Sequence, residues 1–172
     1  YLLIISTSAG LWSYNIGDTI KFTSLEPFRI IVTGRIKHFL SAFGEHVISE
    51  EVEKAMEAAT KLHNVAIREF TVAPNINPKE MLPHHEWYVE FESLPKDMLA
   101  FSKALDKEMT RLNIYYKDLI DGKILKSLEV ISVIRGGFNQ YMKSEGRLGG
   151  QNKVPRLSND RKIADKLKTI ST

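Results

Sequence analysis

The hydrophobic pattern of this chain changes its period once, and that change constrains the fold more than any other feature. In the first forty-odd residues, short apolar runs suited to β-strands occupy residues 1–7, 19–23, 29–33 and 39–43. From residue 49 onward, apolar side chains recur at the spacing of a buried helix face. They are Val52, Met56, Ala59 and Leu62. Strands therefore come first, and a helix follows them.

The rest of the chain mixes both patterns. Residues 86–92 alternate, with Trp87, Val89 and Phe91 on one side and mainly charged residues on the other, which predicts a strand with one buried face. We expect further strands at 65–73 and 128–134, and helices at 95–112, 113–120, 138–144 and from 158 to the end. This order predicts an α+β fold whose antiparallel sheet is flanked by helices.

Composition and charge exclude several classes of protein. With no cysteine, the 172-residue chain has no disulfide, thiolate metal site or cysteine nucleophile. The lack of cysteine is consistent with a cytoplasmic location. No apolar run approaches the roughly 20 residues of a membrane span, so we expect no membrane partner. Residues 135–172 carry nine Lys or Arg and three Asp or Glu, a net charge of +6. Such a tail suits a phosphate, an acidic partner, nucleic acid or a solvated surface.

A glycine turn followed by a carboxylate is the first candidate binding element. In the run from Tyr14 to Asp18, Gly17 allows a tight turn that aims the Asp18 carboxylate away from the strand. The two oxygens of a carboxylate match the two hydroxyls of a ribose. The same run also fits an ordinary turn between strands.

Two basic residues are further candidates. Arg35 follows Gly34 at a strand end, where its planar fork suits a ribose oxygen, a phosphate or a surface ion pair. Lys153 lies in a glycine-rich loop, which allows its compact charge to reach a phosphoryl centre or simply to remain in solvent. The histidines, including the adjacent His84 and His85, lack helical metal-site spacing, so we expect no structural metal.

Taken in order, these runs resemble the C-terminal part of the auxin-responsive acyl-acid amido synthetases, a branch of the adenylate-forming enzymes. Residues 8–18 resemble the late nucleotide motif of that family, written Tyr-Arg-x-Gly-Asp. Gly34, Arg35 and Lys37 resemble the junction between the large and small domains. Residues 151–156 are similar to the terminal Lys-Val-Pro-Arg segment, and the longer phrase Gly-Gln-Asn-Lys-Val-Pro-Arg-Leu-Ser-Asn resembles the bacterial members.

The resemblance implies a role for each matching residue. Asp18 would bind the ribose hydroxyls, Tyr14 would lie near the adenosine or acyl pocket, and Arg35 would contact ribose or phosphate. Lys37 would be the hinge about which the small domain turns. Lys153 would be the lysine inserted during adenylation. Asn15 departs from the motif, because the family has arginine there.

The resemblance also implies a reaction and a division of the chain. Members activate a carboxylic acid with ATP and Mg²⁺ to an acyl-adenylate, and then transfer the acyl group to the amine of an amino acid. Residues 1–36 would be the last strands of the large ATP-binding domain, and residues 37–172 the small mobile domain. The chain begins at Tyr1 rather than at methionine, so we expect it to be part of a longer protein. The resemblance places the phosphate loop and the acyl-binding helices upstream of Tyr1, so we expect the chain to be inactive alone.

Two other functions remain open from the residues. In the first, a related ligase passes the acyl group to a thiol such as coenzyme A, which the discussed residues do not distinguish from an amine. In the second, a non-catalytic module binds nucleic acid through the basic tail. The placement of Trp87, Phe91 and Phe101 on expected buried faces argues against that module, because base stacking needs exposed aromatic rings.

Overall fold

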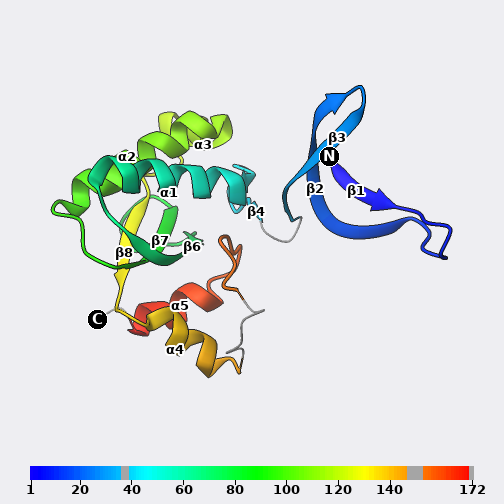
Figure 1. The fold of residues 1–172 in the computed structure, drawn as a ribbon. Coiled ribbons are helices and arrows are strands. Elements are labelled where there is room, and N and C mark those ends of the chain that lie inside the picture. The colour runs from blue at the N-terminus through cyan, green and yellow to red at the C-terminus, as the bar shows by residue number, and fades with distance from the viewer. Residues whose placement is uncertain (36–38, 147–152, 171–172) are drawn as a thin grey trace.

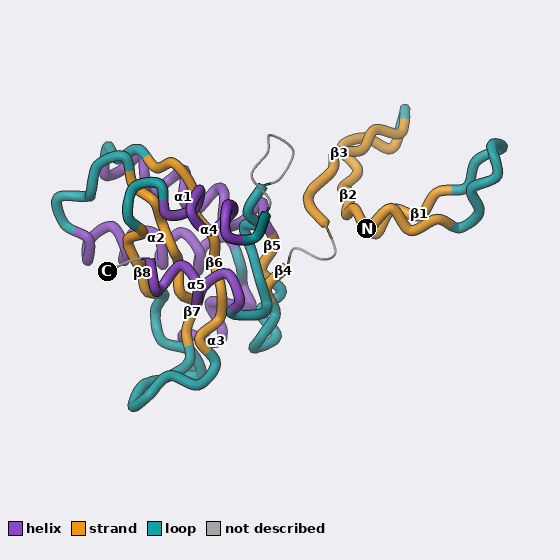
Figure 2. Tube along the Cα trace, turned by 90° about the horizontal axis from the view of Figure 1, so that it is seen from below, coloured by secondary structure: helices purple, strands orange, loops and turns teal. Residues whose placement is uncertain are grey.

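Two three-stranded sheets of different construction organise the chain (Figure 1). The computed structural model describes residues 1–35, 39–146 and 153–170. The first sheet belongs to the N-terminal residues, and the second lies inside a C-terminal body of helices. Figure 2 shows that the first sheet lies beyond the end of this body where β4 and β5 are found. Within the described residues, no helix is both long and apolar enough to span a membrane.

The N-terminal sheet is antiparallel, with the strand order β1-β2-β3. Its strands are β1 (Leu2–Ile5), β2 (Tyr14–Leu25) and β3 (Phe28–Arg35). β2 and β3 are longer than their apolar runs, because cross-strand pairing continues to polar ends such as Asp18 opposite Arg35. Apolar periodicity therefore located these strands but not their ends.

A short hairpin leads from the first sheet into the first helix. It pairs β4 (Phe39–Leu40) with β5 (Val47–Ile48), and α1 (Ser49–His63) follows directly. The Glu51 carboxylate accepts a hydrogen bond from the Ile48 amide at 3.0 Å, so Glu51 caps this helix from its first turn. Ser49 is the first helical residue, and Ile48 occupies the cap position.

The C-terminal sheet is mixed rather than wholly antiparallel. Its order is β6-β7-β8; β7 pairs antiparallel with β6 and parallel with β8. The strands are β6 (Ile67–Asn75), β7 (His84–Phe91) and β8 (Glu129–Val133). Two helices, α2 (Met98–Leu112) and α3 (Ile114–Asp121), lie between β7 and β8 in sequence, and such a crossover returns a strand in parallel. The α+β class is confirmed, while the expected antiparallel pairing holds for one of the two pairs.

Helices cover both faces of this sheet (Figure 1). Helices α1, α2 and α3 pack on the face that carries Trp87 and Val89. The other face carries Tyr88 and is covered by α4 (Gly137–Ser144) and α5 (Lys162–Ile170). All eight residues of β7 are buried. The prediction that this strand has one buried face was therefore wrong, because the C-terminal helices cover the side that alternation marked as polar.

The charged residues on that second face are satisfied inside the protein. Glu86 accepts hydrogen bonds from Arg161 at 2.6 Å, Tyr88 at 2.8 Å and Asn75 at 2.9 Å. Burial acts to raise the pKa of Glu86, but the bonds from Arg161 and Tyr88 outweigh it and hold that pKa below its ordinary value. Glu90 accepts from the backbone amide of Gly136, at the start of α4, at 2.8 Å. These bonds allow a polar strand face to be buried.

Candidate functional site

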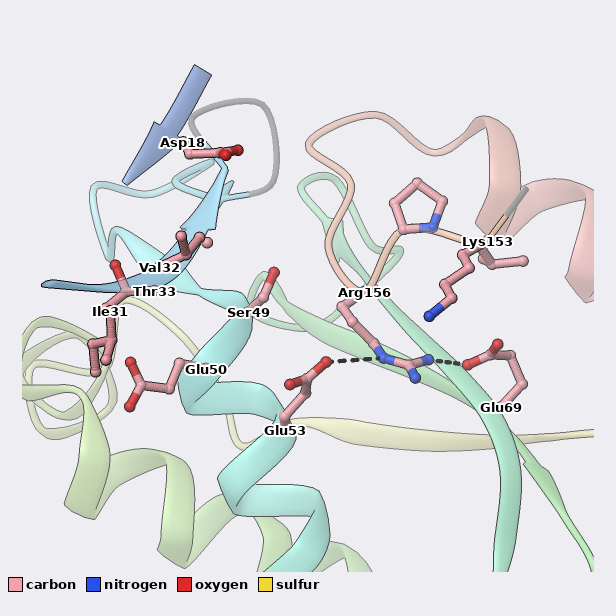
Figure 3. A pocket seen from close by; sticks show the side chains of 13 residues that line it. Asp18, Ile31, Val32, Thr33, Ser49, Glu50, Glu53, Glu69, Lys153 and Arg156 are labelled. Atoms are coloured by element: carbon pink, nitrogen blue, oxygen red, sulfur yellow. Dashed lines mark hydrogen bonds and ion pairs between the residues drawn. The ribbon is translucent and has the colours of Figure 1, made fainter. Parts of the chain in front are cut away.

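An open cavity of about 1070 Å³ lies between the N-terminal sheet and the C-terminal body (Figure 3). Small-molecule sites commonly occupy about 300–1,000 Å³, so the space suits a ligand of nucleotide size. Four parts of the chain line it: the β2–β3 pair, the start of α1, β6, and the segment 153–156. The lining residues are Asp18, Ile31, Val32, Thr33, Gly34, Ser49, Glu50, Glu53, Glu69, Lys153, Val154, Pro155 and Arg156.

Gly17 has the positive φ that a glycine turn requires, but it lies within β2, where the register with β1 shifts, rather than at the end of a strand. Gly17 has a φ of +81°, a conformation that favours glycine. Its amide donates to the Asn15 side-chain oxygen at 2.8 Å, which closes a local turn. Asn15, the departure from the family motif, therefore supports the backbone here. The turn delivers Asp18, which is half-buried, to the cavity.

The other N-terminal residues singled out from the sequence differ in whether they line the cavity. Gly34 lines the cavity, and the backbone of Arg35 pairs with Asp18 across β2 and β3. Tyr14 begins β2, is 52% exposed, and is not among the described lining residues. Lys37, the predicted hinge, lies outside the described residues.

Lys153 lies on the opposite wall of the same cavity, and Figure 3 shows its side chain directed into it. Its side chain is exposed, whereas the next residue, Val154, is buried. Across the described part of the chain, no carboxylate pairs with the Lys153 ammonium. The structure thus brings Asp18 and Lys153, from opposite ends of the sequence, to one cavity.

The charges around this cavity are mixed. Four carboxylates line it, with Lys153 and Arg156 as the basic residues. Glu50 pairs with Lys54 at 2.5 Å along α1. Arg156 pairs with both Glu53, at 3.4 Å, and Glu69. Ion pairing therefore offsets much of the negative charge on the α1 and β6 walls.

Two family models match the chain. The GH3 family central domain matches residues 1–35, and the GH3 family C-terminal domain matches residues 50–162. The second match alone covers more than half of the sequence. The chain belongs to the GH3 family. The resemblance to acyl-acid amido synthetases is thereby confirmed at the level of the family.

Individual GH3 relatives are considerably longer than this chain. Indole-3-acetic acid-amido synthetase GH3.4 of Arabidopsis thaliana is 28% identical, over 91% of this chain and 28% of that protein. The solved structure titled GH3.15 acyl acid amido synthetase has a TM-score of 0.78 at 20% identity, covering all of this chain and 34% of that one. A complex of AtGH3.15 acyl acid amido synthetase with 2,4-DB gives 0.76 at 20% identity and covers 32%. The chain thus spans about a third or less of these proteins, and the structural likeness supports the fold.

The basic tail of this GH3 chain does not form a continuous basic wall. Arg161 pairs with Glu86 and Asp165, and Lys166 pairs with Glu145. Among the described basic residues after position 134, Lys153 and Arg156 line the cavity. Two of the basic residues of the tail therefore reach the cavity wall, while the others named here are held in ion pairs within the C-terminal body.

Sequence reasoning missed the contacts that fix the cavity walls. Arg156 meets Glu53 and Glu69, which are 103 and 87 residues away in sequence. Glu45, which precedes the first helix, is buried and accepts a hydrogen bond from His85, 40 residues away in sequence, at 2.9 Å. No local sequence pattern predicts contacts between residues so far apart in the sequence. Within the described residues, no group of three or more His, Asp or Glu is placed to hold a metal ion.

Proposed function

We propose that this chain is the C-terminal part of a GH3 ligase that uses ATP to join a carboxylic acid to the amine of an amino acid. The observation that carries this proposal is that Asp18 and Gly34 line one side of a cavity whose other side is lined by Lys153. In the proposal, residues 1–36 end the large ATP-binding domain and residues 37–172 form the mobile small domain, with Lys37 at the hinge. The large domain is the partner that completes the site.

Lys153 is the catalytic group of the first step in this proposal. A carboxylate oxygen of the acid bonds to the α-phosphorus of ATP, the bond from that phosphorus to the bridging oxygen breaks, and pyrophosphate leaves. Negative charge gathers on the phosphoryl oxygens during this displacement, and a compact ammonium group stabilises it. The open cavity and the exposed side chain of Lys153 leave room for that approach.

The N-terminal sheet holds the nucleotide in the proposed complex. The Asp18 carboxylate accepts hydrogen bonds from the two ribose hydroxyls, in a position that the Gly17 turn provides. Arg35 contacts ribose or phosphate, and Tyr14 lies near the adenosine or acyl group. Mg²⁺ enters with the phosphates of ATP as part of the substrate.

The second step forms the amide. The acceptor amine attacks the carbonyl carbon of the acyl-adenylate, AMP leaves, and the amine loses a proton. An amine acceptor is proposed because the relatives above carry the name amido synthetase. Incubation of the full-length protein with acid, ATP and either amino acids or coenzyme A tests this. An amide product supports the proposal, and a thioester alone contradicts it.

Exchange of labelled pyrophosphate into ATP tests the role of Lys153 in the full-length protein. Lys153→Ala should lower the acid-dependent exchange rate about 10²–10³-fold, the usual effect of removing one preorganised charge-stabilising group. The melting temperature should barely change, because the side chain is exposed. Lys162→Ala is the matched control, since Lys162 is an exposed lysine nine positions further along the chain. Unchanged exchange in Lys153→Ala would remove Lys153 from the mechanism.

A further inference from the structure

Arg156 joins three elements of the C-terminal body at one point. Its Nε donates to Glu53 on α1 at 3.4 Å, and its Nη1 donates to Glu69 and to the Phe70 carbonyl, both on β6. The guanidinium also stacks over the Phe70 ring, 4.5 Å from its centre. A planar, forked cation satisfies these contacts together, whereas a lysine ammonium does not.

The backbone around Arg156 is fixed as firmly as its side chain. The Arg156 carbonyl accepts from the Val72 amide at 2.9 Å, and the Ser158 amide donates to the Val72 carbonyl at 3.0 Å. The Thr71 hydroxyl donates to the Pro155 carbonyl at 2.7 Å. The segment therefore runs beside β6 as a short parallel bridge. Val154 and Leu157 enter the packing on opposite faces of the sheet.

Lys153 comes immediately before this anchored segment. Hydrogen bonds hold the backbone from Pro155 to Ser158, and the side chain of Val154 is buried. These contacts fix the backbone next to Lys153 at the cavity wall, while the exposed side chain of Lys153 is left able to move. Arg156 also engages the carboxylates of Glu53 and Glu69, which line the same cavity. Without the guanidinium, those two carboxylates would attract the nearby ammonium of Lys153 and oppose an incoming phosphate.

We propose that Arg156 is a positioning residue for Lys153. It fixes the segment that carries the lysine, and it keeps Glu53 and Glu69 from capturing the ammonium. This inference rests on the proposed role of Lys153 in adenylation. It predicts that Arg156 acts on the rate of adenylation through Lys153 and leaves the affinity for ATP nearly unchanged.

A double-mutant cycle on pyrophosphate exchange tests this in the full-length protein. Arg156→Lys, which keeps the charge but loses the fork, should lower kcat about tenfold and change the KM for ATP less than about twofold. In a Lys153→Ala background, the same substitution should have no further effect on kcat. Glu69→Gln removes one carboxylate that anchors Arg156, but it also removes one carboxylate that could capture the Lys153 ammonium. It should therefore lower kcat less than Arg156→Lys does, and only when Lys153 is present.

Arg161→Lys is the matched control, because Arg161 is also ion-paired but contacts Glu86 and the Pro74 carbonyl rather than the Lys153 segment. Its effect on kcat should be the same with and without Lys153. An equal loss of kcat for Arg156→Lys in both backgrounds would overturn the positioning role while leaving Lys153 catalytic. No loss of exchange in Lys153→Ala itself would overturn both proposals.

Discussion

The two parts of this chain bury their apolar side chains to very different extents. In the C-terminal body, Trp87, Phe101 and Tyr116 are fully buried between strands and helices. Among described residues 1–35, Ile20 is the one hydrophobic residue below 9% exposure, while Trp12 is 86% and Phe28 is 77% exposed. The C-terminal body thus contains a two-sided core, whereas the N-terminal sheet presents much apolar surface.

This difference in burial indicates that the two parts of the chain contribute differently to stability and to ligand binding. Burial of large apolar side chains is the main favourable contribution to folding, so the stability of the chain resides in the C-terminal body. The N-terminal sheet matches a part of the GH3 central domain and contributes Asp18 to the cavity. We therefore expect substitutions in the C-terminal core to change stability most, and substitutions on the N-terminal sheet to change ligand binding most.

The largest expected effect contrasts the two tryptophans. Trp87→Ala removes a ring that stacks on Phe70 with centres 5.8 Å apart, and it should lower the free energy of unfolding by about 3–5 kcal/mol. Trp12→Ala should change it by no more than about 0.5 kcal/mol, because that ring is exposed. Urea unfolding followed by far-ultraviolet circular dichroism measures both. Similar losses in the free energy of unfolding for the two variants would contradict the conclusion that stability resides in the C-terminal body.

A smaller effect is expected at the buried pair of Glu45 and His85. Burial acts to raise the pKa of Glu45, but the hydrogen bond and charge of His85 hold it below its ordinary value. The pair connects the approach to α1 with the central strand β7. Glu45→Gln should cost about 2 kcal/mol at pH 7, as expected for a buried bond to a charged group.

The pH dependence of that loss has a defined sign. A lowered folded pKa gives stability that is fully present above the unfolded glutamate pKa of about 4.3 and is lost as pH falls through the folded value. The difference between wild type and Glu45→Gln should therefore shrink below about pH 4. Urea unfolding from pH 3 to pH 7 measures it, with the exposed Glu80→Gln as the control. A constant difference across this range would rule out a linked titration at Glu45.

The smallest expected effect is on binding and lies in the N-terminal sheet. Asp18→Ala should raise the KM for ATP in pyrophosphate exchange roughly tenfold, because charge-assisted hydrogen bonds to the ribose would be lost. Glu26→Gln is the control, since Glu26 is an exposed acid at the β2–β3 turn of the same sheet. An unchanged KM in Asp18→Ala would reject the ribose role.

Sequence patterns located most elements but not the layers they form. The stripe on α2 that includes Phe101, Leu105 and Met109 is buried as its spacing predicts. The polar side of β7 was misjudged, because α4 and α5, which cover it, lie more than forty residues further along the chain. Alternation reports the polarity of a strand face, whereas burial depends on what later packs against it.

The candidate site shows the same limit. Asp18 and Lys153 were identified from short motifs and the family resemblance, and both line the cavity. The ion pairs of Arg156 with Glu53 and Glu69 were not predicted, because they join a loop to a helix and a strand that only the tertiary structure brings together. Short motifs identify groups suited to a ligand, but the contacts that hold those groups depend on distant residues.

In our proposal, the N-terminal sheet and the Lys153 segment form one nucleotide site. A crystal structure of the full-length protein with a non-hydrolysable acyl-adenylate analogue tests it most directly. We predict ribose hydroxyls within about 3.2 Å of the Asp18 carboxylate, and Lys153 lining the same cavity around the phosphoryl group. An adenosine bound elsewhere, with neither Asp18 nor Lys153 lining its site, would contradict the account.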